Sequence, residues 1–458
     1  MYVHRRRIIP SFSFAERLSK NKCISICIVL AIMLSSVCPM SAQSDLGSYF
    51  MKNTWAAFQL NPSFSDSSKL HIAIPVLHTQ AYHSLDVGFQ DIIFNNNGRN
   101  VLSFDGVLDA LDPTNNFESS LDLQTIGVAI KLGQLGINFS HRLRFESQLT
   151  YPEELIRLIF DGNSQFIGET VSFGPSLSMN SFHELALGGN FNLMDKLSIG
   201  ARVKFLSGIG AINTSSSKAT LFTSDDIYQL TFDVDYALQS ASFVDISGVS
   251  DFNFDVNTLN FSNLNFENSG IGFDLGLHYE VSDKLSLSAS VIDLGNITWS
   301  ENVDEFRSQG TFEYDGIDLS NFLVDDGIDF EIKLDTLEEI FAFQQTANTS
   351  FESQLKSSFY IGGDYRLNNN IQLGVLYRNV FANGLNRSSV AVNAQYIMNQ
   401  WLLLGGHFIY HSDINSSIGL QAMVKLGPVQ IYGSTDAVLG LLGNSNQLNG
   451  RLGLGLLF

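Results

Sequence analysis

Cysteine is almost absent from this chain of 458 residues. All three cysteines, Cys23, Cys27 and Cys38, lie within the first 42 residues, and the rest of the chain contains none. A disulfide scaffold, a thiolate metal site and a cysteine nucleophile are therefore excluded after residue 42.

Long hydrophobic runs are equally scarce, and the only clear one lies in the same N-terminal stretch. It covers 14 residues, 24–37, which is shorter than the roughly 17 to 25 residues of a transmembrane helix. Arginines at 5–7 precede it, and small residues at 41–42 follow it. We predict a secretory signal peptide over residues 1–42 and a single domain over residues 43–458.

Basic residues are few and unevenly placed. Without the six Lys and Arg and the one Glu of the predicted signal peptide, 20 basic and 45 acidic residues remain, a net charge of about −25. This excludes the basic surface of a nucleic-acid-binding protein. The acids concentrate near 211–268 and 300–355, and such charge cannot lie in hydrocarbon. We predict that these two sections are acidic surface loops or hairpins.

Motifs of enzyme chemistry are also missing. The sequence has no G-x-S-x-G, no H-E-x-x-H, no P-loop and no G-x-G-x-x-G. Two acidic clusters carry the oxygen ligands that calcium prefers, but neither has the spacing of a calcium-binding loop. They are Asp233 with Asp235, and Asp325 with Asp326 and Asp329. We therefore predict no enzymatic activity, no cofactor and no metal site.

What the sequence does contain is alternation between apolar and polar residues, clearest over residues 359–458. Apolar residues stand at every second position, run for about ten residues, turn over tightly and resume. The paired segments are 359–365 with 371–377, 390–396 with 402–410, and 418–426 with 429–433, and the last segment is 452–458. Alternation with a period of two predicts half-buried β-strands.

Three further pairs precede this region, at 126–132 with 135–139, 185–191 with 199–205, and 271–279 with 285–291. Together with an opening and a closing strand, the six pairs predict about 14 strands. Each is close to the roughly 9 to 11 residues that a tilted strand needs to cross a bilayer. The predicted fold is all-β, a transmembrane antiparallel up-and-down β-barrel with a short helix in a long connection.

A soluble periplasmic β-sandwich would show the same alternation. Aromatic residues near the strand ends favour the membrane barrel, as do the small or polar opposite face and the contrast between short turns and long loops. The aromatic residues are Tyr365, Tyr377, Tyr396, Trp401, Tyr410 and the terminal Phe458.

Two segments do not fit the strand pattern. Residues 43–100 contain Asn-Pro-Ser-Phe at 61–64 and a strand-like stretch broken at Pro75, and are compatible with a first strand or an N-terminal plug. Residues 151–162 predict a helix, because a proline and two glutamates precede an apolar stripe. This helix either folds into the barrel mouth or lies on an outer loop.

Basic residues recur on the polar face of the predicted strands, which in a barrel is the lumen. These residues are Arg142, Arg144, Arg202, Lys204, Arg366, Arg378, Lys425 and Arg451. One interpretation is a pathway for an anionic or amphiphilic ligand, with Arg142, Arg144, Arg202, Lys204, Arg378 and Lys425 as the candidate binding residues. The other is a closed barrel held by ion pairs to Asp274, Glu280 and Asp364, since buried charges need partners.

Longer stretches of sequence carry a family resemblance. They are Asn-Pro-Ser-Phe from Asn61, YPEELIRLIFDGN from Tyr151, ELALGGNFNLMDKLSIGARVKFLSGIG from Glu184, and SSFYIGGDYRLNNNIQLGVLYRN from Ser357. Over nearly the whole chain after the signal, the sequence resembles a large family of Bacteroidota outer-membrane barrels of unknown function. More distantly, it is similar to the long-chain fatty acid transporters and to secretion-associated barrels related to them.

The resemblance implies the outer membrane of a Gram-negative cell, with membrane lipid around the barrel. We expect a barrel that binds or passes a small apolar or amphiphilic molecule through an interior gated by the N-terminal segment and the helix. The alternative is a closed structural barrel that docks a secretion or surface-protein partner. A continuous apolar pocket would favour the first function, and a filled, salt-bridged interior would favour the second.

Overall fold

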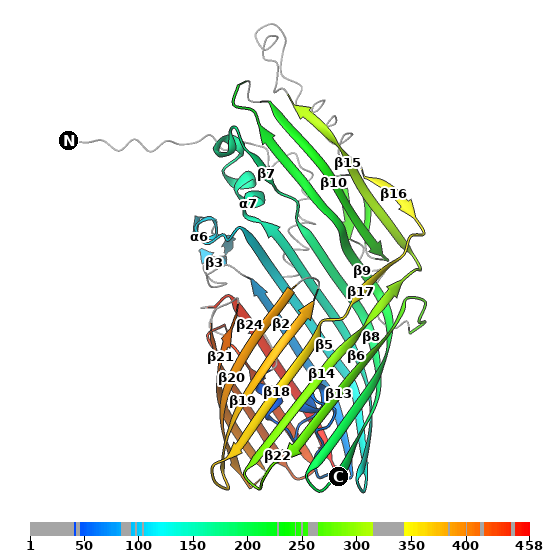
Figure 1. Cartoon of the computed structure of the whole chain (residues 1–458), viewed down its shortest axis with the longest axis vertical. Coiled ribbons are helices and arrows are strands. Elements are labelled where there is room, and N and C mark those ends of the chain that lie inside the picture. Colours follow the sequence, from blue (N-terminus) through cyan, green and yellow to red (C-terminus); the bar gives the residue numbers. More distant parts are fainter. Residues whose placement is uncertain are drawn as a thin grey trace, which may run out of the picture. The chain divides into compact units, whose positions relative to one another are not determined.

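The computed structural model of the chain (Figure 1) describes residues 41–42, 46–83, 93–96, 99–102, 105–226, 229–242, 244–248, 251–254, 264–314, 343–382, 385–399, 401–412, 416–440 and 445–458. The three cysteines, nearly all of the predicted signal peptide, and the cluster of Asp325, Asp326 and Asp329 lie outside these residues. Contacts divide the chain into residues 1–40 and residues 41–458, and the second unit is described below.

Fourteen strands pair antiparallel in a closed ring, so the predicted barrel and its strand number are confirmed. β24 pairs with β2 and closes the ring. In order, the strands are β2 (Leu70–His83), β5 (Thr114–Leu132), β6 (Leu135–Pro152), β8 (Ser176–Met194), β9 (Leu197–Thr223), β13 (Ser269–Glu280), β14 (Leu285–Trp299), β18 (Ser357–Arg366), β19 (Ile371–Ala382), β20 (Leu385–Met398), β21 (Leu402–His411), β22 (Ser417–Leu426), β23 (Val429–Thr435) and β24 (Gln447–Leu457).

The wall of the barrel has an apolar outer face. On β6, Ile137 and Phe139 are both 42% exposed, whereas Ser140 and Arg142, which face the lumen, are almost completely buried. The same alternation runs along β13 and β22. An outer face of large exposed hydrophobic side chains around a polar, filled interior is the pattern of a barrel whose solvent is lipid.

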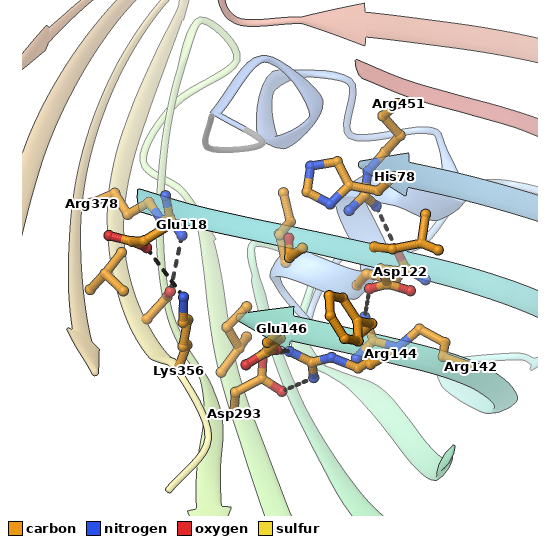
Figure 2. A pocket seen from close by; sticks show the side chains of 18 of the residues that line it. His78, Glu118, Asp122, Arg142, Arg144, Glu146, Asp293, Lys356, Arg378 and Arg451 are labelled. Atoms are coloured by element: carbon orange, nitrogen blue, oxygen red, sulfur yellow. Dashed lines mark hydrogen bonds and ion pairs between the residues drawn. The ribbon is translucent and has the colours of Figure 1, made fainter. Parts of the chain in front are cut away.

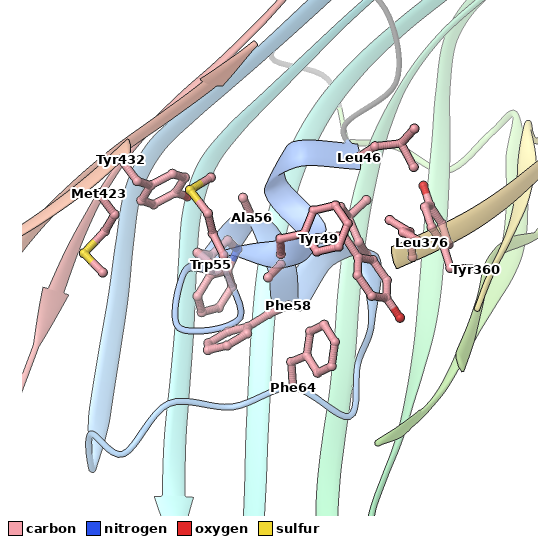
Figure 3. Packing of buried hydrophobic residues seen from close by; sticks show 14 of the residues in the cluster. Leu46, Tyr49, Trp55, Ala56, Phe58, Phe64, Tyr360, Leu376, Met423 and Tyr432 are labelled. Carbon is pink, nitrogen blue, oxygen red and sulfur yellow. The ribbon is translucent and has the colours of Figure 1, made fainter. Parts of the chain in front are cut away.

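The start of the domain forms a plug inside the barrel (Figure 3). After the short strand β1 (Ser41–Ala42) come the helices α3 (Leu46–Phe50) and α4 (Trp55–Leu60), whose residues are all buried. The side chain of Thr54 accepts a hydrogen bond from the Ala57 amide and caps α4. We call residues 46–64 the plug. Residues 43–100 therefore supply both features that the sequence allowed: the plug, and after it the first barrel strand, β2.

The plug is held by apolar packing against the barrel wall. Tyr49, Trp55, Phe58 and Phe64 belong to one buried cluster. Its members from the wall include Tyr360, Leu376, Met423 and Tyr432 (Figure 3). Each large side chain that leaves water here stabilises the closed barrel by about 1.5–3 kcal/mol.

The predicted helix at 151–162 forms as α7 (Glu153–Phe160), in the connection between β6 and β7 (Thr170–Ser172), followed by the 3-10 turn η1 (Asn163–Phe166). None of its residues is buried, and Ile159 is 63% exposed. The exposure of the helix fits the second of the two placements that the sequence allowed, on an outer loop, and a role for it in gating stays a prediction. Among the described residues, no helix is long and apolar enough to span a membrane.

The first acidic section is largely strand over its described residues. β9 continues past the barrel wall and pairs with β10 (Leu230–Ala241), which pairs with β15 (Val303–Tyr314), and β15 pairs with β16 (Gln344–Ala347) (Figure 1). We call this sheet the extension. Within it, Asp233 pairs with Lys218 at 2.5 Å and Asp235 with Arg307 at 2.6 Å.

The remaining elements lie in the connections between barrel strands. They are β3 (Ile93–Asn96), β4 (Arg99–Leu102), α6 (Asp105–Asp109), β11 (Val244–Gly248), β12 (Asp251–Phe254) and β17 (Phe351–Gln354). β17 extends the barrel wall, because it pairs with the end of β14.

Candidate functional site

A buried group of ion pairs runs along the inner wall over the neighbouring strands β5, β6 and β8. Arg142 lies 2.7 Å from Asp122 and 2.6 Å from Glu184. Arg144 lies 2.6 Å from Glu146 and 2.9 Å from Glu184. Both arginines are at most 7% exposed. Their shared carboxylate, Glu184, is 1% exposed and holds two neighbouring cations in one place.

The group continues across β9, β13 and β14. Arg144 lies 2.8 Å from Asp293, which also lies 2.5 Å from Lys204. Lys204 lies 2.6 Å from Asp274, and Arg202 lies 2.8 Å from the same carboxylate. Four of the six predicted binding residues, Arg142, Arg144, Arg202 and Lys204, are thus ion-paired in one cluster.

The partners predicted for these cations are only partly right. Asp274 pairs with Arg202 and Lys204, as expected. Asp364 instead pairs with Lys52 of the plug at 2.6 Å, and Glu280 is exposed at the end of β13. The alternation of β6 and β8 places Glu146 and Glu184 on the polar face, so this signal was present in the sequence.

A cavity of about 130 Å³ lies between this group and the opposite wall (Figure 2). Its floor is the end of α4, at Gln59 and Leu60. The charged residues of its lining are Glu118, Asp122, Arg142, Arg144, Glu146, Asp293, Lys356, Arg378, Arg387 and Arg451. Apolar residues of its lining include Leu121, Phe145, Ile292, Tyr360 and Val380.

Three cations line the cavity from the side of β18, β19 and β20. Lys356 and Arg387 share one carboxylate, Glu118, at 3.2 and 3.0 Å. Arg378 makes no ion pair within the described part of the chain. Its Nη2 donates to the Ser358 hydroxyl at 3.3 Å, and its buried Nε has no hydrogen-bond partner among the described residues. We call Lys356, Arg378 and Arg387 the cationic wall.

The sequence found this wall only in part. Arg378 was predicted, and the structure places it opposite Arg142 and Arg144 (Figure 2). Arg387 lies on the polar face of β20, just before the predicted strand segment 390–396. Lys356 lies between β17 and β18, where irregular backbone has no alternation to read. Lys425 does not line the cavity, since it stands beside the tight turn between β22 and β23, where its backbone amide donates to Trp401.

The plug is fixed to the wall at the Asn-Pro sequence. The side-chain amide of Asn61 donates through Nδ2 to the Tyr49 hydroxyl at 3.0 Å and to the Ala289 carbonyl at 3.2 Å. The side-chain oxygen of Asn61, Oδ1, accepts a hydrogen bond from the Ser63 backbone amide at 3.0 Å. A Cβ on Gly276 would lie 2.1 Å from that oxygen, so the close approach of plug and β13 requires glycine.

The other end of the plug is held by a carboxylate. Asp436 accepts hydrogen bonds from the amides of Leu46 and Gly47 at 2.8 and 3.0 Å. His407 lies 2.8 Å from the same carboxylate, and both side chains are at most 1% exposed. The amides at the start of α3 have no partner within the helix, so a buried carboxylate there satisfies two donors at once.

Fold and site together define a plugged transmembrane β-barrel with a charged cavity on the side of the plug away from the short turns. The chain belongs to a family of unknown function, DUF5723, whose model matches residues 62–436. Membership in a family of unknown function is thus confirmed, and the origin in Bacteroidota stays a prediction. No curated protein matches the sequence.

Several solved barrels are similar in fold. The toluene transporter TbuX of Ralstonia pickettii is 12% identical, over 88% of this chain and 93% of that one, with a TM-score of 0.44. The toluene transporter TodX of Pseudomonas putida is 10% identical, over 91% and 94%, with a TM-score of 0.40. A FadL homologue of Pseudomonas aeruginosa is 10% identical, over 87% and 92%, with a TM-score of 0.39. At these identities the likeness concerns the fold alone.

Proposed function

We propose that this protein lies in the outer membrane, exported by the signal peptide at residues 1–42, and binds a small amphiphilic molecule with an anionic group. The molecule enters the cavity from the side of the extension and passes on when the plug moves. The observation that carries this proposal is the cationic wall, where Arg378 makes no ion pair within the described residues and its buried Nε has no hydrogen-bond partner among them.

The charge of the wall determines which group of the ligand binds there. A cation in a site of low dielectric is unfavourable unless an anion accompanies it. A planar guanidinium binds a carboxylate through two parallel hydrogen bonds. Arg378 has a buried Nε without a partner among the described residues, and the ring of Tyr360 lies beneath it. We therefore assign the carboxylate of the ligand to Arg378.

The size of the cavity limits the rest of the ligand. An apolar cavity of about 150 Å³ holds a benzene ring, and this one measures about 130 Å³. Leu60, Ile292 and Tyr360 supply apolar surface close to the charges. Because the cavity is partly open to solvent, an aromatic or short-chain carboxylate such as benzoate can place its apolar part in this volume and extend its carboxylate along the charged lining.

The competing function is a closed barrel that docks a secretion or surface-protein partner. Two observations favour it: the interior is filled and salt-bridged, and the extension continues beyond the barrel wall as a paired sheet. Such a scaffold has no need for a cavity ligand. The two functions therefore differ in what the purified protein carries.

The test is mass spectrometry of organic extracts from protein purified out of native membranes in mild detergent. An unrelated barrel from the same membranes and the Arg378→Met variant are the controls. An organic acid at near-stoichiometric yield in the wild-type protein, absent from both controls, is the expected result. Equal extracts from all three proteins would refute ligand binding and favour the docking scaffold.

A further inference from the structure

A continuous chain of buried ion pairs joins the cavity to the plug. It begins at Arg144, which lines the cavity, and runs through Asp293, Lys204 and Asp274 to Arg202, with successive distances of 2.8, 2.5, 2.6 and 2.8 Å. Each of the five side chains is at most 8% exposed. We call these five residues the relay.

The relay ends on the backbone of the plug. Arg202 donates through Nη2 to the Phe58 carbonyl at 2.7 Å and through Nη1 to the Gln59 carbonyl at 3.3 Å. These carbonyls belong to the last turn of α4, where four carbonyls lack partners within the helix and a cation is favourable. Arg202 therefore contributes directly to holding the plug.

The second residue of the relay, Asp293, is a strained point in the wall. Asp293 has a φ of 62°, a left-handed backbone conformation that residues other than glycine rarely adopt. It lies in a bulge, where the pairing of β13 with β14 shifts register. Side chains hold it there: the Asp293 amide donates to Asp274 at 2.8 Å, and the Ser357 hydroxyl donates to the Asp293 carbonyl at 2.8 Å. A change in the charges around Asp293 therefore alters backbone as well as side chains.

Because charges alternate along the relay, the effect of a bound anion on each ion pair has a definite direction. An anion that takes Arg144 from Asp293 leaves Asp293 to Lys204 alone, which draws Lys204 away from Asp274. Asp274 then attracts Arg202 more strongly, and Arg202 bonds the plug carbonyls less well. Each link in this sequence is a competition between two partners for one opposite charge.

We infer that the relay couples occupancy of the cavity to release of the plug: an anion held by Arg378 faces Arg144 across the cavity, draws Arg144 from Asp293 and so loosens the end of α4. This inference rests on the proposed function for its ligand, but the coupling belongs to the chain's own residues. Coupling between two sites is reciprocal, so a plug locked in place must also weaken binding in the cavity.

The test uses a cysteine at a position that only an undocked plug exposes. Ala57 of α4 is fully buried, and the predicted loss of residues 1–42 leaves Ala57→Cys as the sole thiol. The measurement is the rate of its reaction with a water-soluble maleimide. In the Ala57→Cys protein, benzoate should raise this rate by roughly 5- to 150-fold, the usual range of coupling. An unchanged rate with benzoate bound would overturn the inference.

A second arm needs no ligand and therefore separates failure of this inference from failure of the proposed function. Arg144→Met and Arg202→Met should each raise the rate in the Ala57→Cys background, and the double variant should react no faster than Arg202→Met alone. Arg307→Met, whose partner Asp235 lies in the extension, outside the cavity and the plug, is the matched control and should change the rate little. Multiplicative effects of Arg144→Met and Arg202→Met would show independent sites and overturn the relay. Heat-modifiable gel mobility confirms that each barrel is folded.

Discussion

The guanidinium carbon of Arg378 lies 5.7 Å from the centre of the Tyr360 ring, in the cavity wall. Tyr360 also contacts the plug, because its ring stacks on the ring of Tyr49 with ring centres 5.2 Å apart. A cation over an aromatic ring is favourable, more so where water is excluded. Tyr360 therefore contacts both the cavity and the plug, from the strand β18 that pairs with β14, where Asp293 of the relay lies.

The carboxylate that holds α3 should control how often the plug opens. Asp436→Ala removes the acceptor of two buried amides and the partner of His407, at a cost of about 1–3 kcal/mol per unsatisfied group. We expect trypsin to cleave after Lys52 of the plug roughly thirtyfold or more faster in this variant, because cleavage follows the population of the open form and about 2 kcal/mol changes that population by this factor.

The control for this experiment is Ser434→Ala. It removes a single neutral hydrogen bond to Ser48 of the plug, 2.8 Å long. Its effect on cleavage should be much smaller. Equal rates in Asp436→Ala and the wild-type protein would contradict the role given to Asp436.

The glycine beneath Asn61 should be essential for closure. Gly276→Val places a side chain where the Asn61 oxygen and the Pro62 ring now lie, at 2.1 and 2.8 Å from the new Cβ. We expect the plug to be displaced and the single-channel current in planar bilayers to rise severalfold. Gly363→Ala is the control, since its nearest neighbour would be the Leu287 side chain at an ordinary 3.4 Å. Wild-type current in Gly276→Val would show that the plug does not depend on this contact.

The outer face of the barrel should tolerate no charge. Leu187 on β8 is 54% exposed, in the apolar belt. Leu187→Arg should lower the free energy of unfolding from lipid vesicles by roughly 2–4 kcal/mol if this position lies near the centre of the bilayer. Gln309→Arg, an exposed position on β15 of the extension, should leave the free energy unchanged. Similar values for both variants would contradict the lipid-facing assignment.

Much of the fold could be predicted because the period of two is a property of the strand itself. Residues 371–377 and 402–410 alternate visibly, and each lies in the strand expected. The position of α7 could not be predicted, because an apolar stripe marks a face that avoids water without indicating what covers it. The plug, with Trp55 and Phe58, is the segment buried inside the barrel, and no local pattern shows which segment will be buried there.

The candidate site was predictable in kind but not in its pairing. Alternation identifies the lumen face, which is why Arg142, Arg144 and Arg378 were found. It says nothing about which acid reaches which base across the barrel, because that depends on strand tilt and register. Asp293 shows the limit most clearly: it lies at a bulge in β14, where alternation breaks and the side chain turns inward.

Isothermal titration calorimetry with benzoate is the most direct test of the central claim, that the cationic wall binds an anionic amphiphile. The wild-type protein should bind benzoate with one site and bind uncharged benzyl alcohol far more weakly. Arg378→Met should weaken benzoate binding by about tenfold or more, since a charge-assisted hydrogen bond contributes about 1.5–3 kcal/mol. Lys425→Met, outside the cavity, should bind as the wild-type protein does. Absence of benzoate binding, or equal affinities in Arg378→Met and the wild-type protein, would contradict the account.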